Sequence, residues 1–75
     1  MSPRLTPLKT LKVIQILHKL GFEKIKQHGS HIYFRHPDGR STAVPMHRGE
    51  DIGKGLIKQI LQDIETSWEN FIQYK

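Results

Sequence analysis

The segment that most constrains the fold is a run of alternating residues enclosed between two turn signals. Residues 31–36 (His-Ile-Tyr-Phe-Arg-His) alternate polar and apolar side chains, which is the period of a half-buried β-strand. The tight connection His28-Gly29-Ser30 precedes this run, and Pro37-Asp38-Gly39, which is typical of a hairpin turn, follows it. We therefore predict that residues 31–36 form the second strand of a three-stranded antiparallel sheet.

The neighbouring residues supply the other two strands. Residues 22–27 are expected to form the first strand, with Ile25 as its clearest core residue. Residues 41–44 are expected to form the third strand, which Pro45 ends because proline has no N–H to give to the ladder. Short turns between successive strands make each pair antiparallel.

Apolar residues at helical spacing lie on both sides of the predicted sheet. Thr6 is expected to cap a first helix, Pro7 to take its first position, and Gly21 to end it. A second helix is expected over residues 54–64. Its apolar stripe consists of Leu56, Ile57, Ile60, Leu61 and Ile64.

A short third helix is expected at the C-terminus. Thr66 and Glu69 have the spacing of a capping box, which predicts a helix to about residue 74. The apolar residues expected to pack this helix on the body are Trp68, Phe71 and Ile72. The predicted order is α-β-β-β-α with a C-terminal helix, an α+β domain in which both long helices cover one face of the sheet. Residues 1–75 are expected to form this single domain, with residues 1–5 as a loose arm and residues 66–75 as an extension.

Charge and composition narrow the class of partner. Twelve Lys and Arg residues face seven Asp and Glu residues, for a net charge of +5. A domain this basic attracts polyanions, nucleic acid above all, although the same charge is ordinary for a well-solvated small domain.

The absence of cysteine excludes disulfides and a thiolate zinc site, and it fits a cytosolic protein. No apolar run approaches the ~20 residues needed to span a bilayer, and the polar, proline-containing segment after Met1 leads us to expect no signal peptide.

Strand alternation predicts one exposed, polar sheet surface. Ile32 and Phe34 must take the core side of the second strand, so the residues between them point the other way. On the first strand, the lysines on either side of Ile25 are expected to share a face. The side chains predicted to gather on the exposed surface are Lys24, Lys26, His31, Tyr33 and Arg35.

This surface is suited to phosphodiester chemistry. The imidazole of His31 can take a proton from a 2′-OH or give one to a departing 5′ oxygen near neutral pH. Neighbouring cations can hold the phosphate, and Tyr33 can stack on a base. Each residue also has a plain structural interpretation: a surface histidine, a strand tyrosine, a positive φ angle at Gly29, and a turn cap at Ser30.

Other histidines and cations leave further alternatives open. His28, His31, His36 and His47 could be considered for zinc, but alternation puts His31 and His36 on opposite faces, and we expect no metal. His47 lies in a polar loop and either approaches His31 or only fixes the loop. Arg48, Lys54 and Lys58, at the start of the second helix, form either a phosphate clamp or ordinary surface charge.

The order of several short motifs resembles one known family. These are Gly21-Phe22, Gln27-His28-Gly29-Ser30-His31, Arg35-His36-Pro37-Asp38-Gly39, Val44-Pro45-Met46-His47, and Gly55-Leu56-Ile57 with Ile60-Leu61. Together they resemble the HicA toxins, the small mRNA interferases of HicA–HicB toxin–antitoxin pairs. The resemblance extends over roughly residues 7–64.

The resemblance implies more than the residue pattern does alone. It implies a fold like a double-stranded-RNA-binding domain, ribosome-independent cleavage of mRNA without a cofactor, and inhibition by a HicB antitoxin that covers the active site. The family's catalytic histidine falls on His31, with Gly29 and Ser30 in support. We therefore expect a toxin-type endoribonuclease, in which Lys24, Lys26, Arg35 and Arg48 engage the RNA backbone. The alternatives are a non-catalytic RNA-binding module and a protein-interaction module with a basic docking face.

Overall fold

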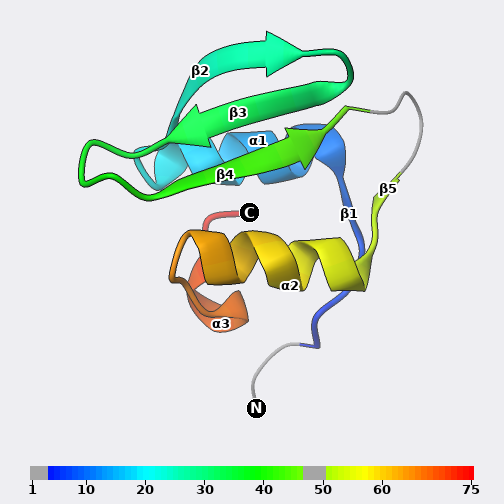
Figure 1. Cartoon of the computed structure of the whole chain (residues 1–75). Coiled ribbons are helices and arrows are strands. Elements are labelled where there is room, and N and C mark those ends of the chain that lie inside the picture. Colours follow the sequence, from blue (N-terminus) through cyan, green and yellow to red (C-terminus); the bar gives the residue numbers. More distant parts are fainter. Residues whose placement is uncertain (1–3, 47–50) are drawn as a thin grey trace.

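An antiparallel sheet with order β2-β3-β4 forms one layer of the molecule, and the helices form the other (Figure 1). The computed structural model describes residues 4–46 and 51–75. The elements in chain order are β1 (Leu8–Lys9), α1 (Thr10–Lys19), β2 (Glu23–His28), β3 (His31–Arg35), β4 (Ser41–Pro45), β5 (Asp51–Ile52), α2 (Lys54–Asp63) and α3 (Trp68–Ile72). This α+β arrangement fits the α-β-β-β-α layout of a double-stranded-RNA-binding domain, so the predicted fold class is confirmed.

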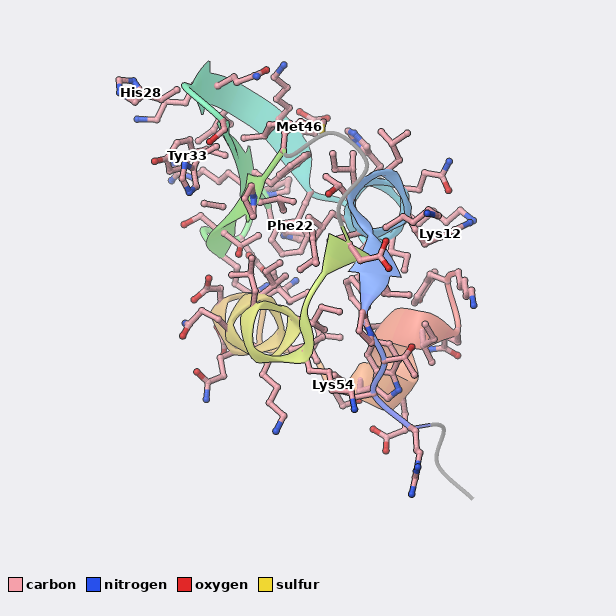
Figure 2. The ribbon with its side chains drawn as sticks, turned by 90° about the vertical axis from the view of Figure 1, so that its right-hand side faces the viewer. Lys12, Phe22, His28, Tyr33, Met46 and Lys54 are labelled. Carbon is pink, nitrogen blue, oxygen red and sulfur yellow. The ribbon has the colours of Figure 1, made fainter. Side chains whose placement is uncertain are left out.

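The core lies between the sheet and the helices. Ile32 and Phe34 of β3 and Val44 of β4 are buried, because they point toward the helix layer. Figure 1 shows α1 behind the sheet and α2 running beside β4, and Phe22 lies between the layers in Figure 2. The opposite face of the sheet is covered by no described element. No helix among the described residues is long and apolar enough to cross a membrane.

The N-terminal helix starts later than the sequence predicts. Thr6 does not cap it: α1 begins at Thr10, and Lys9 is the N-cap, without a side-chain hydrogen bond. Leu8 and Lys9 are instead extended and pair with Ile52 and Asp51 in a small second sheet. Burial of Leu8 and the hydrogen bonds of this pairing outweigh the cap that Thr6 could supply.

Strand β2 contains a β-bulge that strand alternation alone cannot reveal. Lys24 is opposite Phe34 and Lys26 is opposite Tyr33, so Ile25 is the extra residue between them. Ile25 is 54% exposed, and the prediction that it is a core residue is wrong. Phe22, which precedes the strand, fills the core position there and is 1% exposed.

The turns and the C-terminal part follow the predictions with small shifts. Gly21 ends α1 with a φ of +95°, as expected of a glycine after a helix. In α2 the predicted stripe is buried except for Leu56, which is 37% exposed. Trp68 and Phe71 are buried as predicted, but the cap of α3 is Ser67, whose Oγ accepts the Asn70 amide at 3.2 Å.

Candidate active site

The end of the β2–β3 hairpin is a two-residue turn beside His31. Gly29 has a φ of +60°, whereas the φ of Ser30 is not positive. This is the pattern of a type II′ turn with glycine at its first central position. The Ser30 carbonyl accepts the Met46 amide at 2.6 Å, so the end of β4 is bonded to this turn. The turn therefore has a fixed shape at the point where β3 begins.

His31 is the first residue of β3 and is exposed. Its neighbours across the sheet are His28 in β2 and Pro45 in β4. Within residues 4–46 and 51–75, no hydrogen bond or ion pair engages its side chain. The imidazole of His31 is thus available to a substrate.

We use the name open face for the side of the β2-β3-β4 sheet turned away from α1. Burial of Ile32 and Phe34 assigns the alternate residues of β3 to it, and the strand pairing extends the assignment to β2 and β4. The side chains assigned to the open face are Glu23, Ile25, Lys26, His28, His31, Tyr33, Arg35, Ser41, Ala43 and Pro45. His28 and Tyr33 project from the same side of the sheet in Figure 2.

A shallow hollow lies in the middle of the open face. It has a volume of about 350 Å³ and is lined by Ile25, Lys26, Tyr33, Phe34, Ser41, Thr42 and Ala43. The ammonium nitrogen of Lys26 lies 5.0 Å from the centre of the Tyr33 ring, within the range of a cation–π contact. The hollow thus combines an aromatic ring, an apolar side chain and a cation, and the aromatic residue, Tyr33, is two residues along β3 from His31.

The structure does not bring every predicted RNA-binding residue to the open face. Lys24 is opposite Phe34 and lies on the other side of β2, where its Nζ donates to Gln27 Oε1 at 3.2 Å. The prediction that Lys24 and Lys26 share a face is wrong, because the bulge separates them. Arg35 reaches the open face but lies directly opposite Glu23.

The second predicted group of cations is only partly described. Lys54, at the start of α2, lies at the far end of the molecule from His28 in Figure 2, so it does not extend the open face. His47 and Arg48 lie outside the described residues.

His36 has a structural environment remote from His31. Its ring packs against Phe22, with centroids 5.2 Å apart, and its Nδ1 lies 3.0 Å from Asp38 Oδ1. The Arg40 amide hydrogen bond, with the Arg40 guanidinium and His36 beside it, lowers the pKa of the Asp38 carboxyl. In the part of the chain that the structure describes, no three His, Cys, Asp or Glu side chains are grouped to hold a metal ion.

Two features of the site were not predicted from the sequence. Ile25 joins the hollow because of the bulge, which has no signature in the alternation of β2. His28 lies on the open face directly opposite His31, and the spacing His-x-x-His across a Gly-Ser turn was a signal that could have revealed it. An accessible imidazole, a second imidazole, an ammonium group and an aromatic ring on one face are suited to acid–base chemistry on a single-stranded polyanion.

Comparison with known proteins identifies the family. No curated protein matches the chain. A family model described as HicA toxin of bacterial toxin-antitoxin matches residues 12–65, a stretch that includes the whole open face. Membership implies a toxin that acts on RNA as a ribonuclease and has a cognate antitoxin as its partner. Because the match spans well over half of the 75 residues, the chain belongs to the HicA toxin family of bacterial toxin–antitoxin systems.

Proposed function

We propose that residues 1–75 form one HicA-like domain that cleaves mRNA as a metal-independent endoribonuclease, with His31 as its catalytic histidine. The observation that carries this proposal is the position of His31: an exposed imidazole at the hairpin end, on the open face and within the matched residues, with no hydrogen bond or ion pair to any residue of 4–46 or 51–75. An imidazole in such a place can act as general acid or base near neutral pH without a cofactor.

The chemistry requires one proton to leave the 2′-OH and one to reach the departing oxygen. As the 2′ oxygen attacks phosphorus, a new P–O2′ bond forms and the P–O5′ bond breaks. The products are a 2′,3′-cyclic phosphate and a 5′-hydroxyl. His31 takes part in this proton transfer, while nearby cations stabilise the charge that develops on the phosphate.

The other predicted contacts have unequal support. Lys26 and Tyr33 at the hollow favour contact with a phosphate and a stacked base, respectively. Gly29 and Ser30 shape the turn that presents His31. Contacts from the remaining cations stay predictions; these are Lys24, Arg35, His47 and Arg48.

We also infer that the cognate antitoxin is a HicB-like protein that covers the open face. A protein surface of net positive charge attracts an acidic partner as well as RNA. Occupation of the open face would block His31 directly, since the histidine lies on its surface rather than in an enclosed pocket.

The test is RNA cleavage by the purified protein in the presence of EDTA. Wild type should cleave, and His31→Ala should lose at least about 10²-fold in rate while it keeps its thermal unfolding midpoint. His18→Ala is the matched control, because His18 lies on α1 and packs edge-on against Phe34 away from the open face. Cleavage by His31→Ala at the wild-type rate would overturn the assignment of the catalytic residue. Salt-sensitive RNA binding without cleavage by either protein would identify a binding module instead.

A further inference from the structure

Two histidines lie opposite each other at the end of the β2–β3 hairpin. His28 is the last residue of β2, His31 is the first of β3, and the strand register pairs them. Directly opposite residues in antiparallel strands project to the same face, with Cβ atoms roughly 4.5–5.5 Å apart. Both side chains are exposed. Two imidazoles therefore flank one small area of the open face.

The bulge in β2 is what gives His28 this orientation. His28 lies four positions after Lys24, so a regular strand would direct both side chains to the same side. Lys24 faces the helix side opposite Phe34, and the extra residue Ile25 turns the remainder of β2 over. As a result, the half of the strand nearest the turn presents His28 beside His31.

We propose that His28 is a second catalytic residue, which shares the two proton transfers of RNA cleavage with His31. This inference rests on the proposed function. One imidazole, in its neutral form, accepts the proton of the 2′-OH as the P–O2′ bond forms. The other, as imidazolium, donates a proton to the 5′ oxygen as the P–O5′ bond breaks. One proton thus passes from O2′ to the pair and one from the pair to O5′, and exchange with water restores the starting state.

The position of His28 and His31 directly opposite each other suits two separate proton transfers. A phosphodiester has its attacking and leaving oxygens on opposite sides of phosphorus, so two groups on either side of the phosphate serve them better than one. The groups that face the pair along the strands are Lys26, two residues before His28, and Tyr33, two residues after His31. Across β4 the facing residue is Pro45, which carries no charge. The ammonium of Lys26 adds a positive charge to the same face, where it attracts the phosphate toward the pair.

The test compares two substrates in full-length protein with EDTA present. One substrate is single-stranded RNA, and the other is uridine 3′-(4-nitrophenyl phosphate), whose leaving group needs no proton. His28→Ala should lose about 10²-fold or more in kcat/KM on RNA, and the pH profile should lose one of its two limbs. If His28 donates the proton, the loss disappears with the nitrophenyl substrate; if it accepts the proton, the loss persists with both. Either result supports the inference.

Controls separate a chemical role from a structural one. Gln27→Ala alters the adjacent residue of β2, which lies opposite the buried Ile32 and thus on the other side, and should cleave like wild type. His28→Gln retains a polar side chain of similar length and should be as impaired as His28→Ala, with an unchanged unfolding midpoint. RNA cleavage by both His28 variants within about threefold of wild type, with both limbs of the pH profile intact, would overturn the inference. Failure of wild type itself to cleave would overturn the proposed function and this role together, whereas a loss confined to His31→Ala would overturn only the role of His28.

Discussion

Tyr33 is the residue that joins the two parts of the open face. It is half-buried, two residues along β3 from His31, and its ring lies beneath the Lys26 ammonium at the hollow. An aromatic ring in an open depression is a stacking surface for an unpaired base. The ring of Tyr33, rather than its hydroxyl, should therefore determine how tightly single-stranded RNA binds.

Replacement of Tyr33 tests this directly. Tyr33→Leu should weaken the binding of single-stranded RNA by about 1–3 kcal/mol, because leucine keeps an apolar side chain there but has no π face. Tyr33→Phe should bind like wild type. Both are measured by fluorescence anisotropy in the His31→Ala background, so that no RNA is cut. Tyr74→Leu alters an exposed tyrosine near the C-terminus, and an equal loss there would contradict a specific role for Tyr33.

Between elements, the junction of α1 and β2 depends on Gly21. Its φ of +95° is unfavourable for other residues, and a Cβ at this position would lie 3.0 Å from Nε2 of His36. Gly21→Ala should lower the free energy of unfolding by roughly 1–2 kcal/mol from the backbone alone. Displacement of the His36 ring from Phe22 should add to this loss. Urea denaturation at neutral pH measures the total.

Gly39 provides the matched comparison for Gly21. It has a similar φ of +103° in the β3–β4 turn, but no atom lies within 4 Å of the position its Cβ would take. Gly39→Ala should therefore show the backbone cost without the contact with His36. Equal losses for the two substitutions would mean that packing of His36 contributes nothing at the junction.

The sequence predicted the elements of the sheet better than the orientation of their side chains. The predicted first residue of β3, His31, is correct, because Ile32 and Phe34 alternate with polar neighbours and the turns on both sides contain glycine. The prediction of a strand at β2 is correct, but the predicted faces of its side chains are not, since simple alternation does not allow for the extra residue of a bulge. Its Lys-Ile-Lys sequence fits a regular strand as well as a bulged one, and in the bulged register Phe22 rather than Ile25 is the buried residue.

The same limit applies at the N-terminus and at the site. Thr6-Pro7 is a good local start for a helix, but the partner that makes Leu8 a strand lies more than forty residues away, at Ile52. Local patterns cannot report such a contact. The exposed position of His31 was predicted and is confirmed, whereas the hollow beside it required the bulged register.

At the scale of the whole molecule, the net charge of +5 matters through its distribution. On the open face, Lys26 lines the hollow and lies two residues before His28, while Arg35 is opposite Glu23. Lys54 carries an equal charge at the start of α2, away from this face (Figure 2). If RNA lies along the open face, these two lysines should differ in their effect although they contribute equally to the net charge.

The salt dependence of RNA binding distinguishes the effect of Lys26 from that of Lys54. For single-stranded RNA, log Kobs falls with log salt by about 0.7 for each phosphate that a cation neutralises. Lys26→Gln should weaken binding and reduce the slope by about that amount. Lys54→Gln should leave the slope close to that of wild type. Identical changes in both variants would show that RNA responds to the overall charge rather than to the open face.

The bulge in β2 also bears on how readily the edge of the sheet can pair with a second copy of the chain. β2 is an outer strand, paired only with β3 among the described elements, so its other edge presents backbone groups to which a further strand could bond. A bulge interrupts the regular spacing of those groups and increases the local twist, and the lysines on either side of Ile25 direct charge to both faces of the edge. The irregularity that turns His28 toward His31 thereby also makes the edge a poor template for edge-to-edge aggregation.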